Sequence, residues 1–161
     1  ASVIPRFINL ATKNQSLPVT DSRMTRFMMS LDQSVNLVLE ALLSGKNGDI
    51  FIQKSKACKI NDLAKAVHIF LNKKSKINIT GPRHGEKLNE TLVSYEEMAF
   101  AKETKDHFVI KKDNRSINYN LYEHLGNKKR IKLNDYSSDN AEQLNIKEIV
   151  KLLKSTNADL L

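Results

Sequence analysis

Hydrophobic residues recur at helical spacing in the first half of the chain, which predicts amphipathic helices. In the segment from Val3 to Lys13, Pro5 is tolerated only in the first turn, so we expect this helix to begin near Ile4. The next helix should follow Ser30, where Gln33 completes a capping box, and should end at Gly45. The apolar face of this second helix consists of Leu31, Val35, Val38, Leu39 and Leu42.

Three later segments are also predicted to be helical. The clearest is Ile60 to Asn72, and the others are Tyr95 to Lys102 and a terminal helix from Ile146 to Lys154 with Asn145 near its N-cap. The first of these turns a continuous apolar face inward, formed by Ile60, Leu63, Ala64, Val67, Phe70 and Leu71.

Short apolar runs between the helices predict strands. The segment from Asp49 to Gln53 has the pattern of a buried strand, and the polar stretch from Asp113 to Asn140 predicts no regular element. The other expected strands are Leu17 to Thr20, Ile77 to Ile79 and His107 to Lys111, with Arg26 to Met29 as a further candidate.

Helices and strands alternate over the first half of the chain, and this order predicts an α/β fold. Only about three short strands are expected before Lys87, too few for a complete doubly wound sheet. Neither a GxGxxG nor a GxxxxGK[ST] phosphate loop is present. We therefore expect an incomplete α/β structure with an exposed sheet edge and exposed apolar helix faces, and poor solubility of the isolated chain.

Length and composition narrow the class of protein. The chain has 161 residues and is 40% hydrophobic, which fits one domain, or one domain plus an appendage, and excludes a disordered chain. It contains no apolar run of membrane-spanning length and no signal peptide. A single cysteine, Cys58, excludes an internal disulfide and indicates a cytoplasmic setting. The first residue is Ala1, so the chain is either processed or a piece of something longer.

The net charge of +8 raises the hypothesis of a nucleic-acid-binding or other anion-binding protein. The lysines are scattered along the chain and form no basic stripe interleaved with aromatic residues. Compositional bias therefore explains the charge better than a nucleic-acid interface does.

Three residues are the best candidates for binding chemistry. Arg26 follows a polar turn, and Arg83 lies in a loop rich in glycine and proline. A guanidinium group binds phosphate with two parallel hydrogen bonds and stays charged, so two such groups from separate loops could clamp a diphosphate. Glu86 could accept both hydroxyls of a ribose or cap a following helix. Taken alone, each arginine is better explained as a solvated or ion-paired surface residue.

The histidines and the cysteine predict no metal or nucleophile site. The four histidines lack metal-ligand spacing, His68 is expected to pack against its helix, and His84 is expected to bond to a loop backbone. Cys58 has no nearby histidine and is expected to be a small packed residue.

Two motifs make the sequence specific: Met24-Thr-Arg-Phe-Met-Met-Ser30 and Gly81-Pro-Arg-His-Gly-Glu-Lys87. Together they resemble the polysaccharide-biosynthesis branch of the extended short-chain dehydrogenase/reductase superfamily. Members of this branch include UDP-N-acetylglucosamine 4,6-dehydratases and 5-epimerases, and some relatives are labelled UDP-glucose 4-epimerases. The resemblance covers nearly the whole chain.

The resemblance implies that this chain is the C-terminal, substrate-binding part of an extended Rossmann-type enzyme. At the nucleoside end, Ser2, Val3 and Ile4 would lie beside the nucleotide and contact uracil through the backbone. Val19 and Thr20 would border the base.

The resemblance also assigns the polar candidates. Arg26 and Arg83 would hold the diphosphate of a UDP-sugar, and Glu86 would bind the ribose hydroxyls. Pro82 and Asn89 depart from the family pattern, where a small polar residue and a tyrosine are expected.

The family's cofactor loop and its Tyr-x-x-x-Lys pair are missing from this sequence. The resemblance therefore implies no cofactor in this chain, no catalytic residue, and NAD(P) in a missing N-terminal half. It divides the chain into a substrate-binding part, residues 1–94, and a C-terminal extension, residues 95–161.

Three hypotheses for function remain at this point. The first is a UDP-sugar-binding portion of a dehydratase or epimerase for capsule, O-antigen or lipopolysaccharide synthesis, inactive alone. Such a portion would need a separately encoded cofactor-binding half, and the complete enzyme would form a homo-oligomer. The second is a stand-alone UDP-sugar-binding or interaction module, and the third is the basic anion-binding or nucleic-acid-binding protein.

Overall fold

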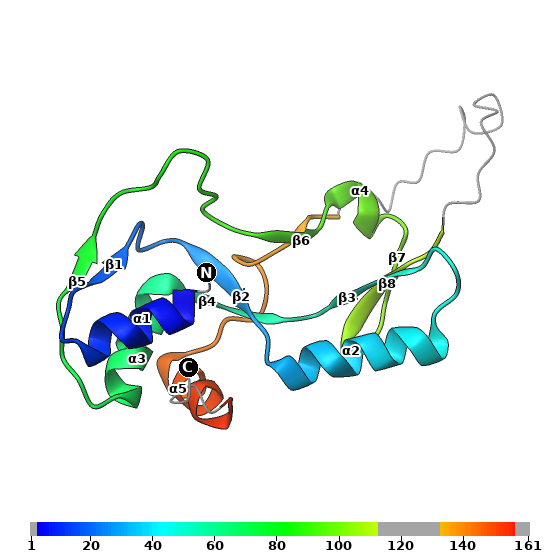
Figure 1. Cartoon of the computed structure of the whole chain (residues 1–161). Coiled ribbons are helices and arrows are strands. Elements are labelled where there is room, and N and C mark those ends of the chain that lie inside the picture. The colour runs from blue at the N-terminus through cyan, green and yellow to red at the C-terminus, as the bar shows by residue number, and fades with distance from the viewer. Residues whose placement is uncertain (1–2, 113–132, 157–161) are drawn as a thin grey trace. The chain divides into compact units, whose positions relative to one another are not determined.

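The computed structural model describes residues 3–112 and 133–156, which form two compact units. Unit 1 comprises Ala1–Asp32, Ser55–Glu90 and Ser137–Leu161, and unit 2 comprises Gln33–Lys54 and Thr91–Tyr136. Figure 1 shows the order of the elements along the chain. The fold is mixed α/β, which confirms the predicted class.

Unit 1 contains one parallel and one antiparallel pair of strands. The parallel pair joins β1 (Leu17–Val19) to β5 (Ile77–Ile79), and the antiparallel pair joins β2 (Thr25–Met28) to β4 (Lys56–Lys59). Among the described residues, β1 and β5 each have one neighbour, so both strands are sheet edges. This two-stranded parallel sheet agrees with the expectation of an incomplete α/β structure.

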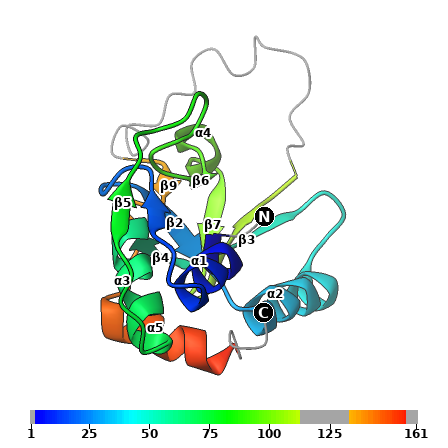
Figure 2. The ribbon, with the colours of Figure 1, turned by 60° about the vertical axis from the view of Figure 1, so that its left-hand side comes forward.

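The three helices of unit 1 form its core with these strands. Helix α3 (Ile60–Phe70) lies beside both α1 (Val3–Thr12) and α5 (Ile146–Ser155), as Figures 1 and 2 show. Burying one such aliphatic or aromatic side chain contributes roughly 1.5–3 kcal/mol. The side chains that close the core are at most 1% exposed: Phe7, Leu17, Leu63, Val67, Ile149 and Leu153.

Local sequence determines where two of these helices begin or end. At α5, Asn145 accepts a hydrogen bond from the Glu148 backbone N–H at 3.1 Å, while the Glu148 carboxylate accepts from the Asn145 N–H at 2.8 Å. This capping box confirms the predicted helix start. Helix α3 ends where Asn72 adopts a positive φ of 50°, a conformation that asparagine tolerates better than most residues.

Unit 2 contains an antiparallel sheet with the order β3-β8-β7, formed by Ile50–Gln53, His107–Ile110 and Ala101–Glu103. Its other elements are α4 (Tyr95–Met98) and β6 (Thr91–Val93), while α2 (Leu31–Ser44) and β9 (Tyr136–Ser137) each cross the boundary of the two units. Helix α2 has no buried residue. Six of its apolar side chains are exposed: Leu31, Val35, Val38, Leu39, Leu42 and Leu43.

Two secondary-structure predictions need correction. The helix expected from Tyr95 to Lys102 ends at Met98, because Ala101–Glu103 pairs with β8 instead. The strand after Asp49 is not buried: Ile50 is 53% exposed, because β3 lies at an edge of its three-stranded sheet. Strands β4, β6, β7 and β9 were not predicted. The division at residue 94 stays a prediction.

Within the described residues, no helix is both long enough and apolar enough to cross a lipid bilayer.

Candidate functional site

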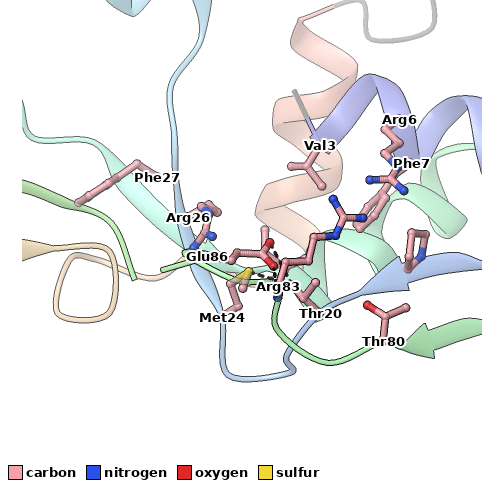
Figure 3. Close-up of a pocket in the computed structure, with 12 residues that line it drawn as sticks. Val3, Arg6, Phe7, Thr20, Met24, Arg26, Phe27, Thr80, Arg83 and Glu86 are labelled. Atoms are coloured by element: carbon pink, nitrogen blue, oxygen red, sulfur yellow. Dashed lines mark hydrogen bonds between the residues drawn. The ribbon is translucent and has the colours of Figure 1, made fainter. Parts of the chain in front are cut away.

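Unit 1 contains a cavity of about 450 Å³. Its lining comes from α1, from the β1 to β2 region, from the start of α3 and from the loop that follows β5, and Figure 3 draws these residues as sticks. Both polar and apolar side chains line it. The lining residues are Val3, Arg6, Phe7, Pro18, Thr20, Met24, Arg26, Phe27, Ile60, Thr80, Arg83 and Glu86.

The loop of residues 80–90 presents Arg83 and Glu86 to this cavity. Gly81 and Gly85 have φ values of 81° and 75°, in the left-handed region that glycine adopts without strain. The Glu86 backbone N–H donates to the Arg83 carbonyl oxygen at 3.1 Å and closes a turn that contains Gly85. The two glycines therefore determine how the loop is shaped around its charged residues.

Glu86 is held by two donors. Its Oε2 accepts from the Arg83 backbone N–H at 3.2 Å, and its Oε1 accepts from the Thr20 hydroxyl at 3.4 Å. Figure 3 shows the carboxylate between Thr20 and Arg83. The sequence predicted Thr20 and Glu86 as site residues, and the structure brings them together across 66 positions of the chain.

The side-chain N–H groups of Arg26 form hydrogen bonds within the protein. Its guanidinium donates to the carbonyl oxygens of Thr25 at 2.7 Å, Leu88 at 3.1 Å and Lys87 at 2.8 Å. Its Nε also lies 3.3 Å from a carboxylate oxygen of Glu90. Arg26 lines the cavity and at the same time braces the end of the 80–90 loop against β2.

The guanidinium groups of Arg83 and Arg6 have no hydrogen-bond or ion-pair partner within residues 3–112 and 133–156. Both side chains are exposed and both line the cavity. The sequence analysis missed Arg6. Its spacing of three residues from Val3, which places both on one side of α1, was the available signal.

Of the remaining predicted site residues, some line the cavity and others do not. Val3 lines the cavity, whereas Val19 is fully buried in the core and Ile4 packs against the core. Neither Ile4 nor Val19 is a lining residue, and Ser2 lies outside the described residues. The lining residues that the sequence analysis did not assign, besides Arg6, are Phe7, Pro18, Met24, Phe27, Ile60 and Thr80.

A buried polar network secures the C-terminal end of the loop. The Thr25 hydroxyl lies 2.7 Å from the Ser138 hydroxyl and 2.9 Å from Asn89 Oδ1. The Glu90 backbone N–H donates to Ser138 Oγ at 2.9 Å, and the Ser138 N–H donates to the Glu90 carbonyl at 2.8 Å. Asn89, which departs from the family pattern, is thus an accepting partner in this network.

The structure also accounts for the thiol and for two histidines. Burial, with a smaller contribution from Asp62, raises the pKa of the Cys58 thiol to about 12, so Cys58 is a core residue as expected. His68 shares a 2.8 Å hydrogen bond with Ser75, and desolvation lowers its pKa, while His84 is exposed. Within the described part of the chain, no cluster of three or more His, Cys, Asp or Glu residues could hold a metal ion.

Comparison with known proteins places this chain in a family. A family model described as "Polysaccharide biosynthesis protein" matches residues 1–112, and one described as "Polysaccharide biosynthesis protein C-terminal" matches residues 113–158. These two matches cover almost the whole chain.

Similar curated proteins are about twice as long. A UDP-glucose 4-epimerase of Rickettsia canadensis (strain McKiel) is 48% identical over 97% of this chain and 46% of its own length. A UDP-glucose 4-epimerase of Rickettsia rickettsii (strain Sheila Smith) is 49% identical over 94% of this chain and 45% of its own length. The chain therefore spans less than half of each relative.

A solved structure agrees with the sequence matches. The X-ray structure of Pen from Bacillus thuringiensis superposes with a TM-score of 0.77 at 34% identity, over 96% of this chain and 45% of that one. The resemblance read from the two arginine-containing motifs is thus confirmed. The chain belongs to the polysaccharide biosynthesis protein family.

Proposed function

We propose that this chain is the UDP-sugar-binding C-terminal portion of a nucleotide-sugar epimerase or dehydratase. The observation that carries the proposal is the convergence of Thr20, Arg83 and Glu86 on one cavity, with Arg26 bracing the loop. These groups supply what a nucleoside diphosphate requires: cationic donors for the phosphates and a carboxylate acceptor for the ribose hydroxyls. The names of the relatives support this ligand class.

In the proposed complex, Glu86 accepts hydrogen bonds from the ribose hydroxyls. Its carboxylate is already oriented by the Arg83 N–H and by Thr20, so little conformational entropy is lost on binding. Arg83 contacts the diphosphate directly, while Arg26 holds the loop that carries Arg83 and Glu86. Val3 and Thr20, which line the cavity, are proposed to border the base.

The chemical steps belong to the complete enzyme in this proposal. The residues that bind the sugar nucleotide here would orient it toward NAD(P), which supplies hydride transfer when bound by a separate half. The chain alone should therefore bind UDP-sugar without converting it. We also propose that it acts in the cytoplasm, where the sugar nucleotide is available, and that the complete enzyme is a homo-oligomer.

Isothermal titration calorimetry of the purified chain with UDP-glucose and UDP-N-acetylglucosamine tests the proposal. We expect saturable binding to at least one of them, and no conversion when NAD+ is added. Absence of binding to both sugar nucleotides and to UDP refutes the proposed function.

The role of Glu86 has a sharper test. A hydrogen bond to a charged group contributes about 1.5–3 kcal/mol, so Glu86→Gln should weaken UDP binding by about 10-fold to 100-fold. The same substitution should change binding of 2′,3′-dideoxy-UDP little, because that ligand lacks the ribose hydroxyls. Glu96→Gln is a matched control, since Glu96 lies in α4, outside the cavity, and the charge change is the same. Equal losses for the two ligands contradict the ribose assignment.

A further inference from the structure

We propose that Arg6 is a second phosphate-binding residue of this cavity and that it grips the diphosphate together with Arg83. The inference rests on the proposed function, because it assigns residues to the diphosphate of the same ligand. It also gives Arg26 a different task, which is to position the loop that carries Arg83 and Glu86.

The position of Arg6 is the first reason. It lies on α1, and its side chain lines the same cavity as Arg83, which comes from the loop after β5. In Figure 3 the Arg83 side chain extends from its loop toward α1, and its guanidinium group is drawn between Val3 and Arg6. Two guanidinium groups thus approach one space from two separate elements.

The use of hydrogen-bond donors is the second reason. A guanidinium group that binds phosphate with two hydrogen bonds needs a free edge. Arg26 already donates to the carbonyls of Thr25, Lys87 and Leu88, and its Nε pairs with Glu90. To grip a diphosphate bidentately, Arg26 would have to give up part of this set. Arg6 and Arg83 have their donors available among the described residues.

Electrostatics is the third reason. The acidic side chain that lines the cavity, Glu86, is engaged by the Arg83 backbone N–H and by Thr20. Among the described residues, the guanidinium groups of Arg6 and Arg83 line one cavity with no carboxylate paired to either, so an anion that enters meets two positive charges. Helix α1 has no acidic residue in its first turn, and Val3 of that turn lines the cavity, so the positive end of the helix dipole adds to the same field.

A series of shortened ligands tests the proposal. Affinities of UDP, UMP and uridine are measured for the wild-type chain and for Arg6→Gln, Arg6→Lys and Lys13→Gln by calorimetry or ligand-observed NMR. Lys13 follows α1 immediately, is exposed and does not line the cavity, so Lys13→Gln makes the same change in net charge elsewhere.

We expect Arg6→Gln to weaken UDP about tenfold, UMP less, and uridine by less than twofold, because the lost contact is to phosphate. Arg6→Lys should recover part of the UDP affinity, since it restores charge without the planar fork. Lys13→Gln should stay within twofold of wild type for every ligand. Arg26→Gln should weaken all three ligands by similar factors, because it loosens the loop that also carries Glu86.

Several results overturn the inference, and they can be told apart. If wild type binds UDP and Arg6→Gln binds it equally well, the assignment of Arg6 is wrong while the proposed function stands. If Arg6→Gln weakens UDP and uridine equally, Arg6 acts through the fold and not on phosphate. If wild type binds none of the ligands, the proposed function and the inference both fail. A loss with Arg26→Gln that is confined to phosphate-containing ligands makes Arg26 the direct contact.

Discussion

Replacement of Ser138 by alanine removes the centre of the polar network that secures the 80–90 loop. Ser138 is fully buried, and Thr25 is 4% exposed. The Ser138 hydroxyl lies 2.7 Å from the Thr25 hydroxyl and accepts from the Glu90 backbone N–H at 2.9 Å. Alanine therefore leaves the Glu90 N–H without its acceptor and the Thr25 hydroxyl with one partner fewer.

The size of the effect follows from these contacts. Each lost intramolecular hydrogen bond costs about 0.5–1.5 kcal/mol. Two such bonds give a loss of about 1–3 kcal/mol in the free energy of unfolding. For a small domain this lowers the urea midpoint by about 1 M.

Equilibrium urea unfolding followed by circular dichroism measures this loss. Ser155→Ala is the matched control, because Ser155 is exposed and its hydroxyl donates only to the Leu152 carbonyl at 2.9 Å within α5. We expect the control to lie within about 0.5 kcal/mol of wild type, as surface substitutions usually do. If Ser138→Ala is as stable as Ser155→Ala, the network does not stabilise the fold as argued.

Three further predictions concern other parts of the chain. Hydrogen bonds from the side chain and backbone of Arg23 lower the pKa of Asp21 to about 2. The stability advantage of wild type over Asp21→Asn should therefore be complete above about pH 4 and disappear as the pH falls through 2, and urea midpoints that show a constant difference contradict this. Because burial raises the pKa of Cys58 to about 12, its thiol should react with Ellman's reagent only after unfolding, and rapid labelling of the native chain would disprove it. Leu42 and Leu43 are 77% and 84% exposed, so replacing both by glutamate should reduce self-association in light scattering without lowering the urea midpoint; unchanged scattering argues against α2 as the adhesive surface.

Where structure depends on neighbours along the chain, the sequence was sufficient. The α5 start was predicted because Asn145 is a typical N-cap residue, and its capping box joins residues only three positions apart. The buried side of α3 was predicted because its apolar residues repeat with the helical period, and Leu63 and Val67 are fully buried. The family was also predicted from sequence, because the motif with Arg26 and the motif with Arg83 are each a continuous stretch of residues.

Strands β4 and β7 lack a local strand pattern and were not predicted from sequence. Strand β4 has the sequence Lys-Ala-Cys-Lys, which has little strand propensity, and it forms because Cys58 lies opposite Arg26 in β2. Strand β7 follows a helical segment with no break in pattern, and pairing of Lys102 with Val109 determines its conformation. In both cases backbone hydrogen bonds to a paired strand outweigh local preference.

The candidate site divides in the same way. The sequence by itself determined which charged residues the chain offers, and it singled out Arg26, Arg83 and Glu86. Only the tertiary structure decided how they are used: Arg26 is bonded to carbonyls 61 and 62 positions away, whereas Arg83 has no side-chain partner among the described residues and lines the cavity with Arg6 of α1. Motif spacing records which residue types are present, but whether a guanidinium group is free depends on acceptors that only folding brings to it.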